Sequence, residues 1–124
     1  MPERIIIPTE DQNGLNSRLA GHFGRAPYFA VVDLEDNKEI SNVETVSNVG
    51  EHAGGRGHAH DNILRLMPQV VIVYGMGPRG LMSFQNAGIA VLRANADTVT
   101  GVIDAYRKNE LQELTDGCQE AHHH

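Results

Sequence analysis

Residues 70–92 read VVIVYGMGPRGLMSFQNAGIAVL, and this stretch decides the fold class of the chain. Val70 to Tyr74 is an uninterrupted apolar run, which is typical of a strand buried on both faces. A glycine-bearing turn leads from it into a short helix, Leu81 to Ala87, which Gly88 ends. Ile89 to Leu92 then forms another buried strand. Strand, helix and strand in this order predict a right-handed crossover between parallel strands, and so an α/β protein.

The residues before this unit predict three further strands. Arg4 to Pro8 (RIIIP) reads as a short buried strand, and Tyr28 to Leu34 (YFAVVDL) as a near-continuous apolar run. Ile40 to Val46 (ISNVETV) shows hints of period-two alternation, and the polar stretch Glu35 to Lys38 suits the turn before it. The second and third strands are therefore expected to form an antiparallel hairpin.

Two more helices are expected. One begins near His58 and ends after Met67, because apolar residues recur at helical spacing and Pro68 stops it. The other follows Asp97, which can cap it. Its apolar stripe comprises Val99, Val102, Ile103 and Tyr106. The complete order predicts a mixed sheet of five strands covered by helices.

Length and composition indicate one soluble domain. The chain has 124 residues, of which 40% are apolar and 21% charged, and we expect a single domain over 1–114 with a flexible tail over 115–124. No run approaches the roughly twenty apolar residues of a membrane span, and no signal peptide is apparent, so a cytoplasmic location is expected. The net charge of −6 argues against general binding to nucleic acid or anionic membranes.

Ligands of such sheets bind outside the carboxyl ends of the parallel strands. Here those ends lead into Thr9 to Gly24, Gly75 to Gly80 and Arg93 to Asp97. The chemistry of these three segments, and of two histidine-bearing segments elsewhere, decides the functional hypotheses.

The segment GMGPRG, Gly75 to Gly80, matches the pattern of a dinucleotide-binding turn. The helix after it is short, and the next strand ends in Arg93 and Asn95 rather than in an acid that could bind a ribose, so we expect no nucleotide. Gly75 and Gly77 would still permit close approach of an anion to the amides of a helix N-terminus. The alternative is a tight strand-to-helix turn with Pro78 near the first helical position.

The segment HFGRAP, His22 to Pro27, combines an imidazole, a glycine and a guanidinium before the second strand. Arg25 could hold an anionic oxygen or sulfur atom, and His22 could bind a metal or donate a hydrogen bond. The alternative is that Phe23 fills the core and His22 is merely its polar neighbour.

The segment HAGGRGHAHD, His52 to Asp61, carries candidate metal ligands in His52, His58 and His60 and a candidate anion contact in Arg56. If a helix has begun by His58, this residue and His60 point to nearly opposite sides and cannot share one ligand sphere. The loop could fold over a ligand, or it could be a solvated loop with scattered histidines.

The ending GCQEAHHH adds a weaker metal candidate, Cys118 with His122. A thiol and imidazoles would suit copper or zinc if this ending folds back. The alternatives are disorder and a residual purification tag. Because Cys118 is the only cysteine and no nucleophile has a convincing partner, we expect no enzyme activity.

Taken together, these pieces resemble the dinitrogenase iron-molybdenum cofactor biosynthesis domain family, which includes NifX-like proteins and the C-terminal domain of NifB-type proteins. The chain is also similar to the stand-alone members of the orange protein type, which carry a molybdenum-copper sulfide cluster. The most specific match is HFGRAPYF followed by an aspartate-bearing strand. The matching segments are IIIPTEDQNGLNSRLAGHFGRAPYFAVVDLED, VVIVYGMGPRGLMSFQNAGIAVL and TVTGVIDAYRKNEL.

The resemblance implies a ribonuclease H-like α/β motif with helices on both faces of the sheet. It also implies noncovalent carriage of an anionic metal-sulfur cluster, of the iron-molybdenum or the molybdenum-copper type, for donor and acceptor proteins. His22, Gly24, Arg25 and the Gly75 to Gly80 turn, with Gly77 inside it, match the family. The histidines of residues 52–60 are added on chemistry alone.

Two other functions stay open at this point. The chain could be a metal-free regulatory or scaffold module that binds a protein partner, or a small enzyme that uses the glycine turn for a nucleotide phosphate. The cysteine-rich parts of larger cofactor-assembly proteins are absent from the sequence, so cluster synthesis by this chain alone is not expected.

Overall fold

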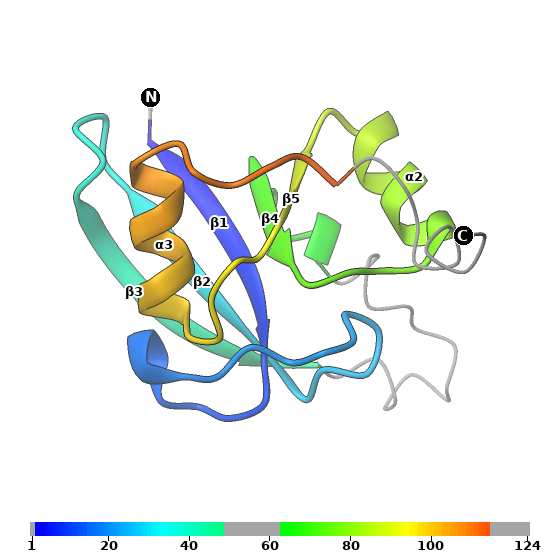
Figure 1. Ribbon diagram of the computed structural model, residues 1–124, viewed down its shortest axis with the longest axis horizontal. Coiled ribbons are helices and arrows are strands. Elements are labelled where there is room, and N and C mark those ends of the chain that lie inside the picture. The colour runs from blue at the N-terminus through cyan, green and yellow to red at the C-terminus, as the bar shows by residue number, and fades with distance from the viewer. Residues whose placement is uncertain (1, 49–62, 115–124) are drawn as a thin grey trace.

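The computed structural model describes residues 2–48 and 63–114, which form one five-stranded mixed sheet (Figure 1). The strand order is β3-β2-β1-β4-β5. β1 is parallel to β4, which is parallel to β5, whereas β2 is antiparallel to β1 and β3. The predicted hairpin and mixed five-stranded sheet are confirmed. The strands are β1 (Glu3–Thr9), β2 (Tyr28–Leu34), β3 (Ile40–Ser47), β4 (Val70–Val73) and β5 (Ala90–Arg93).

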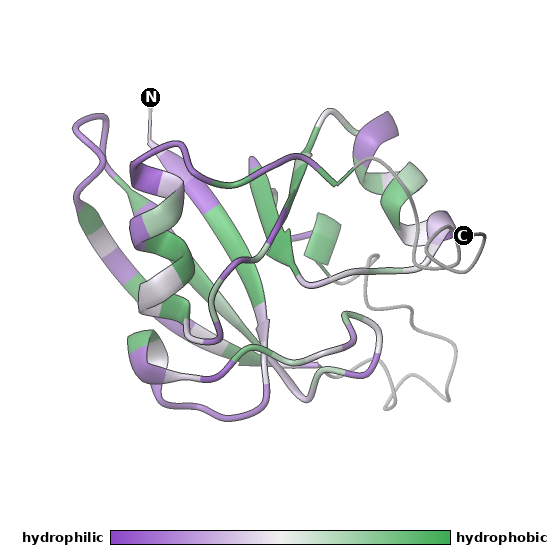
Figure 2. Ribbon diagram, in the orientation of Figure 1, coloured by the Kyte–Doolittle hydropathy of each residue, from purple (hydrophilic) through white to green (hydrophobic). Residues whose placement is uncertain are grey.

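The sheet has a core on each face, as the period-two alternation of its strands requires. We call the two surfaces the α2 face and the α3 face, after the helices α2 (Pro78–Asn86) and α3 (Val99–Arg107). Figure 2 shows hydrophobic residues along the central strands between these helices. On the α2 face, Ile6, Val31, Val71, Val73 and Val91 pack with Leu81 and Phe84. On the α3 face, Ile5, Ile7, Val32, Val70 and Ile72 pack with Val99, Val102 and Ile103.

Both helices begin at other residues than the sequence predicted. Helix α2 starts at Pro78, three residues before Leu81, because the fixed φ of proline suits the first helical position. Helix α3 is capped by Thr98 and not by Asp97: the Thr98 hydroxyl accepts a hydrogen bond from the Gly101 N–H at 3.1 Å. Thr98 is the extended residue directly before the helix, and Asp97 lies one residue too early to reach its first turn.

The predicted helix over 58–67 is described only at its end. Ile63 and Leu64 are helical, and the residues before them lie outside the described part of the chain. The sequence predicted that this helix extends to Met67, but in the structure it ends at Leu64. Met67 has a positive φ of 55° and so lies outside the helical region, which Pro68 disfavours for the residue before it.

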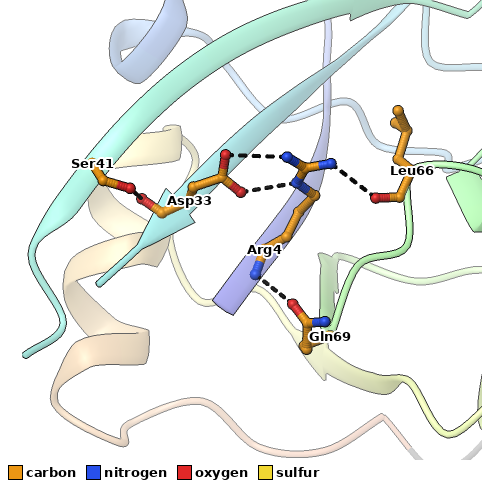
Figure 3. Close-up of polar contacts among 5 residues, drawn as sticks. All are labelled: Arg4, Asp33, Ser41, Leu66 and Gln69. Atoms are coloured by element: carbon orange, nitrogen blue, oxygen red, sulfur yellow. Dashed lines mark hydrogen bonds and ion pairs between the residues drawn. The ribbon is translucent and has the colours of Figure 1, made fainter. Parts of the chain in front are cut away.

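At the amino ends of the parallel strands, Arg4 joins three segments (Figure 3). Its Nε and Nη2 donate to the two carboxylate oxygens of Asp33 on β2, at 2.9 and 3.3 Å. Its Nη1 donates to the Leu66 carbonyl at 3.0 Å, and its backbone N–H donates to Gln69 Oε1 at 2.7 Å. This hydrogen bonding to Asp33 raises the pKa of Arg4. The segment that leads into β4 is thereby fixed to β1.

No helix within residues 2–48 and 63–114 is long and apolar enough to cross a membrane.

Candidate functional site

Three loops begin at the carboxyl ends of β1, β4 and β5, the end opposite Arg4 (Figure 1). Backbone hydrogen bonds hold two of them together: the Leu19 N–H donates to the Asp97 carbonyl at 3.0 Å, and the Val99 N–H to the Ser17 carbonyl at 3.0 Å. The loop that follows β5 is tied to β4, because the Ala94 N–H donates to the Val73 carbonyl at 2.7 Å. The segments that the sequence placed at the strand ends thus form one edge of the molecule.

Phe23 anchors the loop that carries His22 and Arg25. Its side chain is buried on the α2 face, and its ring centroid lies 5.3 Å from that of Phe29 on β2 and 5.5 Å from that of Phe84 on α2. A core role for Phe23 was the alternative interpretation of HFGRAP, and the structure bears it out. The same packing also fixes where the two flanking side chains stand.

His22, Gly24 and Arg25 surround this anchor and are exposed. Within residues 2–48 and 63–114, the side chains of His22 and Arg25 make no hydrogen bond or ion pair. A Cβ atom built on Gly24 would meet no atom within 4 Å, so the backbone here is open to a neighbouring molecule. One imidazole and one guanidinium therefore have no partner in the described part of the chain, on a loop that an aromatic cluster anchors.

The Gly75–Gly80 turn presents the N-terminus of α2 at the same edge. Gly77 is the N-cap residue, is exposed, and has no side chain with which to cap the helix. The amides of the first helical turn have no intrahelical acceptor, so those of Arg79 and Gly80 are available to an anion. The φ of Gly77 is −65°, which any residue can adopt, so the backbone does not require glycine there.

The two interior residues of this turn have different roles. Met76 is buried in the core of the α2 face, to which Phe23 also belongs. Gly75 is half-buried. Gly80 lies inside α2, where an added Cβ would contact the Met76 sulfur at 3.6 Å, an ordinary packing distance. Phe23, Met76 and Leu81 belong to one hydrophobic cluster, so the His22 loop and the turn into α2 share a core.

The remaining candidate ligands lie outside the described residues. They are His52, Arg56, His58, His60, Cys118 and His122. We predicted that residues 52–60 could fold over a ligand and that Cys118 could contribute a thiol. Both stay predictions.

Within the described ranges, the site offers positive charge and hydrogen-bond donors rather than a set of metal ligands. His22 is the only histidine there, and no group of three histidine, cysteine or acidic side chains in those ranges could hold a metal ion. Such a donor set suits an anion whose metal atoms already have their own sulfide or oxide ligands. It does not suit a bare cation.

Two arginines at this edge did not enter the sequence-based site. Arg79 lies in the first turn of α2 and Arg93 ends β5; both are exposed, and neither forms an ion pair with any residue that the structure describes. The sequence placed Arg93 in a segment at the strand ends, but assigned it no contact with a ligand. Strand periodicity could have shown that its side chain lies on the same face as Val91.

Tyr74, directly after β4, is a further residue of this edge. Its hydroxyl donates to the Ala96 carbonyl at 3.0 Å. Burial, and secondarily the charge of Asp97, raises the pKa of Tyr74. The phenol therefore stays protonated and ties β4 to the loop after β5.

A shallow hollow of about 460 Å³ lies elsewhere, around Arg4 and Asp33 at the amino ends of the parallel strands. None of the residues predicted from the sequence lines it. Because the Arg4 guanidinium is already bound to Asp33 and Leu66, the polar groups of the hollow serve the fold.

Comparisons with known proteins agree with this architecture. The model of the family described as dinitrogenase iron-molybdenum cofactor matches residues 3–109. The protein MJ0580 of Methanocaldococcus jannaschii is 33% identical over 114 residues, which are 90% of this chain and 91% of that protein.

Solved structures show the same fold. The crystal structure of PH0822 is 32% identical, with a TM-score of 0.74, and the match covers 91% of this chain and 96% of that one. The NifB-like protein TM1290 of Thermotoga is 27% identical, with a TM-score of 0.75 and coverage of 95% and 98%. The apo form of the orange protein of Desulfovibrio gigas, 23% identical, has a TM-score of 0.73 with coverage of 92% and 94%, and this likeness concerns the fold alone.

Proposed function

Because this chain belongs to the dinitrogenase iron-molybdenum cofactor family, we propose that it binds an anionic, molybdenum-containing metal-sulfur cluster and carries it between assembly proteins. The cluster is cargo, held without a covalent bond, with molybdenum accompanied by iron or by copper. The chain does not transform its cargo. Its partners are proteins that donate or accept the cluster.

One observation carries the proposal: within residues 2–48 and 63–114, an imidazole and a guanidinium have no partner, and their loop shares a core with the helix whose N-terminus lacks a side-chain cap. His22 and Arg25 are exposed on the loop that Phe23 anchors, and Phe23 packs against α2, which Gly77 leaves without a side-chain cap. Guanidinium and amide N–H groups donate to sulfur or oxygen atoms at the surface of a cluster and balance its charge. The His22 imidazole can donate a hydrogen bond or bind one exposed metal atom.

Anaerobic reconstitution tests the proposal. The protein is incubated with tetrathiomolybdate, with and without copper(I), passed through gel filtration, and examined by visible absorption and metal analysis. The parent for all variants carries alanine at residues 122–124, so that metal held by the histidine run is not mistaken for cargo. We expect a chromophore at a fixed ratio to protein that survives gel filtration.

Two variants and one control locate the bound cluster. His22→Ala and Arg25→Gln should each lower retention, because they remove a metal ligand or hydrogen-bond donor and a positive charge. Arg65→Gln also removes one exposed arginine, but at the amino end of β4, and should behave as the parent. The proposal is wrong if no chromophore is retained, or if His22→Ala and Arg25→Gln both retain as much as Arg65→Gln.

A further inference from the structure

Arg93 lies on the face of the sheet that carries the candidate site. In β5, Val91 packs in the core of the α2 face, whereas Ala90 and Leu92 pack towards the α3 face. Successive side chains of a strand alternate between faces, so the Arg93 side chain projects on the α2 side. The residue is exposed.

The pairing of β5 with β4 places Arg93 beside the glycine turn. Arg93 is the register partner of Val73, the last residue of β4, and Gly75 follows only two residues later. Arg79 then stands in the first turn of α2. Arg93 thus flanks the turn whose helix amides form one side of the proposed cargo site.

The charge of these arginines is not balanced within the described ranges. Arg25, Arg79 and Arg93 form no ion pair there, although the whole chain carries a net charge of −6. Arg4 shows the contrasting case, because both carboxylate oxygens of Asp33 accept hydrogen bonds from it. Within residues 2–48 and 63–114, three guanidinium groups without ion-pair partners thus stand on segments at the carboxyl ends of the parallel strands, and such groups suit a multiply charged anion.

We propose that Arg93, together with Arg79, completes the cargo site opposite Arg25 and makes it select dianions or higher anions over monoanions of the same shape. This inference rests on the proposed function and assigns a charge class to the cargo. Arginine suits this task because its guanidinium is always charged and donates through a planar fork to oxygen or sulfur acceptors.

Arg18 provides a matched control at the same end of the sheet. It forms a β-bridge with Thr98, next to the N-terminus of α3. Arg18 is exposed, and its charge lowers the pKa of Tyr74 whereas those of Asp97 and Glu10 raise it. Its removal changes the net charge as the removal of Arg93 does, but leaves Arg25, Arg79 and Arg93 in place.

Two probes of equal shape and different charge test the inference: tetrathiomolybdate, a dianion, and tetrathioperrhenate, a monoanion. Binding is measured by anaerobic equilibrium dialysis with elemental analysis, in the parent with alanine at residues 122–124. We expect Arg93→Gln to weaken tetrathiomolybdate binding about 3- to 10-fold, and tetrathioperrhenate binding by less. Arg93→Lys should keep the preference for the dianion in part, and Arg79→Gln with Arg93→Gln should abolish it.

The outcomes separate this inference from the proposed function. If the parent binds tetrathiomolybdate and Arg93→Gln binds both probes as the parent does, Arg93 has no part in the site and the carrier proposal stands. A loss in Arg18→Gln equal to that in Arg93→Gln would show a general charge effect and overturn the inference. If the parent binds neither probe, the proposed function itself fails. Thermal unfolding of each variant verifies that it is folded.

Discussion

Tyr106 couples the ionisation of a single side chain to the stability of the fold. Its hydroxyl donates to Glu3 Oε1 at 2.8 Å, and the Lys38 ammonium lies 5.1 Å from the centre of its ring. Burial is the main cause that raises the pKa of Tyr106, and the hydrogen bond to Glu3 adds to it. The neutral phenol is therefore favoured in the folded state.

The direction of this shift predicts how stability depends on pH. Because the pKa is higher in the folded than in the unfolded protein, the stabilisation is complete below the unfolded value of about 10 and is lost as pH rises towards the folded value. The melting temperature of the parent should therefore fall more steeply between about pH 9 and pH 11.5 than that of Tyr106→Phe. Tyr28→Phe, which removes a hydroxyl that accepts from Gln12, serves as the control. Identical slopes for all three proteins would contradict the prediction.

Predictions for single residues from the sequence were incomplete, because the contacts of a side chain depend on the tertiary structure. The sequence identified His22 and Arg25 as candidates, and the structure leaves both exposed. It could not decide between Asp97 and Thr98 as the helix cap, because both residue types cap helices and only the backbone angles distinguish them. Arg93 was missed, because its relation to the glycine turn depends on strand register.

At the scale of elements, the two helices differ in the space around a glycine in their first turn. A Cβ atom on Gly101 in α3 would lie 2.7 Å from the Ala96 Cβ and 3.2 Å from the Thr98 Oγ1. A Cβ atom on Gly80 in α2 would make only an ordinary contact of 3.6 Å with the Met76 sulfur. Helix propensity alone favours alanine over glycine at both positions by up to about 1 kcal/mol.

Gly101→Ala should therefore destabilise the protein by about 1–2 kcal/mol, because the overlap with Ala96 outweighs the gain in propensity. Gly80→Ala, the matched control, should be neutral or stabilising. Combining Gly101→Ala with Ala96→Gly removes the overlap and should recover most of the loss. Urea unfolding of the four proteins measures these differences. A Gly101→Ala variant as stable as Gly80→Ala would show that the α3 start adjusts freely.

At the N-terminus of α2, adding a helix cap should raise stability but weaken cargo binding. Gly77→Asp would supply the missing cap and place a negative charge at the positive end of the helix, so stability should rise by about 0.5 kcal/mol. The same carboxylate occupies the free amides and repels an anionic cargo, so retention of tetrathiomolybdate should fall. Gly77→Ala adds a Cβ where no atom lies within 4 Å, and should retain the cargo. Equal retention by both variants would separate the α2 N-terminus from the site.

Elements were predicted best where burial alone determines them. The range Tyr28–Leu34 is the same in the sequence prediction and in the structure, because every residue of that strand except Tyr28 and Asp33 is buried. Helix starts were less accurate, since Pro78 and Thr98 act through backbone angles that periodicity does not reveal. The end before Met67 was placed too late, because the effect of Pro68 extends to the residue before it.

At the scale of the whole molecule, the fold separates a structural end from a proposed binding end. At the amino ends of the parallel strands, Arg4 is bound to Asp33, Leu66 and Gln69 (Figure 3). At the carboxyl ends, Arg25, Arg79 and Arg93 have no such partners in residues 2–48 and 63–114. The sequence predicted that a ligand binds at the carboxyl ends of the parallel strands, because open α/β sheets bind ligands there. Which arginines form ion pairs could be seen only in the tertiary structure.

Phe23 connects the core of the α2 face to the proposed binding end, and this connection yields a last prediction. Phe23→Leu keeps an apolar side chain but loses the ring contacts with Phe29 and Phe84, at a cost of about 1–2 kcal/mol in unfolding free energy. Because these contacts also fix the loop of His22 and Arg25, the variant should bind tetrathiomolybdate more weakly although Phe23 itself is buried.

The control for this variant is a core substitution of similar cost on the other face. Val102→Ala removes fully buried side-chain volume from the α3 face, and should lower stability without changing retention of the cargo. Urea unfolding and equilibrium dialysis on the two variants measure both quantities. If Phe23→Leu and Val102→Ala lose stability to a similar extent and bind alike, the position of the His22 loop does not depend on the aromatic cluster. A loss of binding confined to Phe23→Leu would show that core packing on the α2 face sets the geometry of the site.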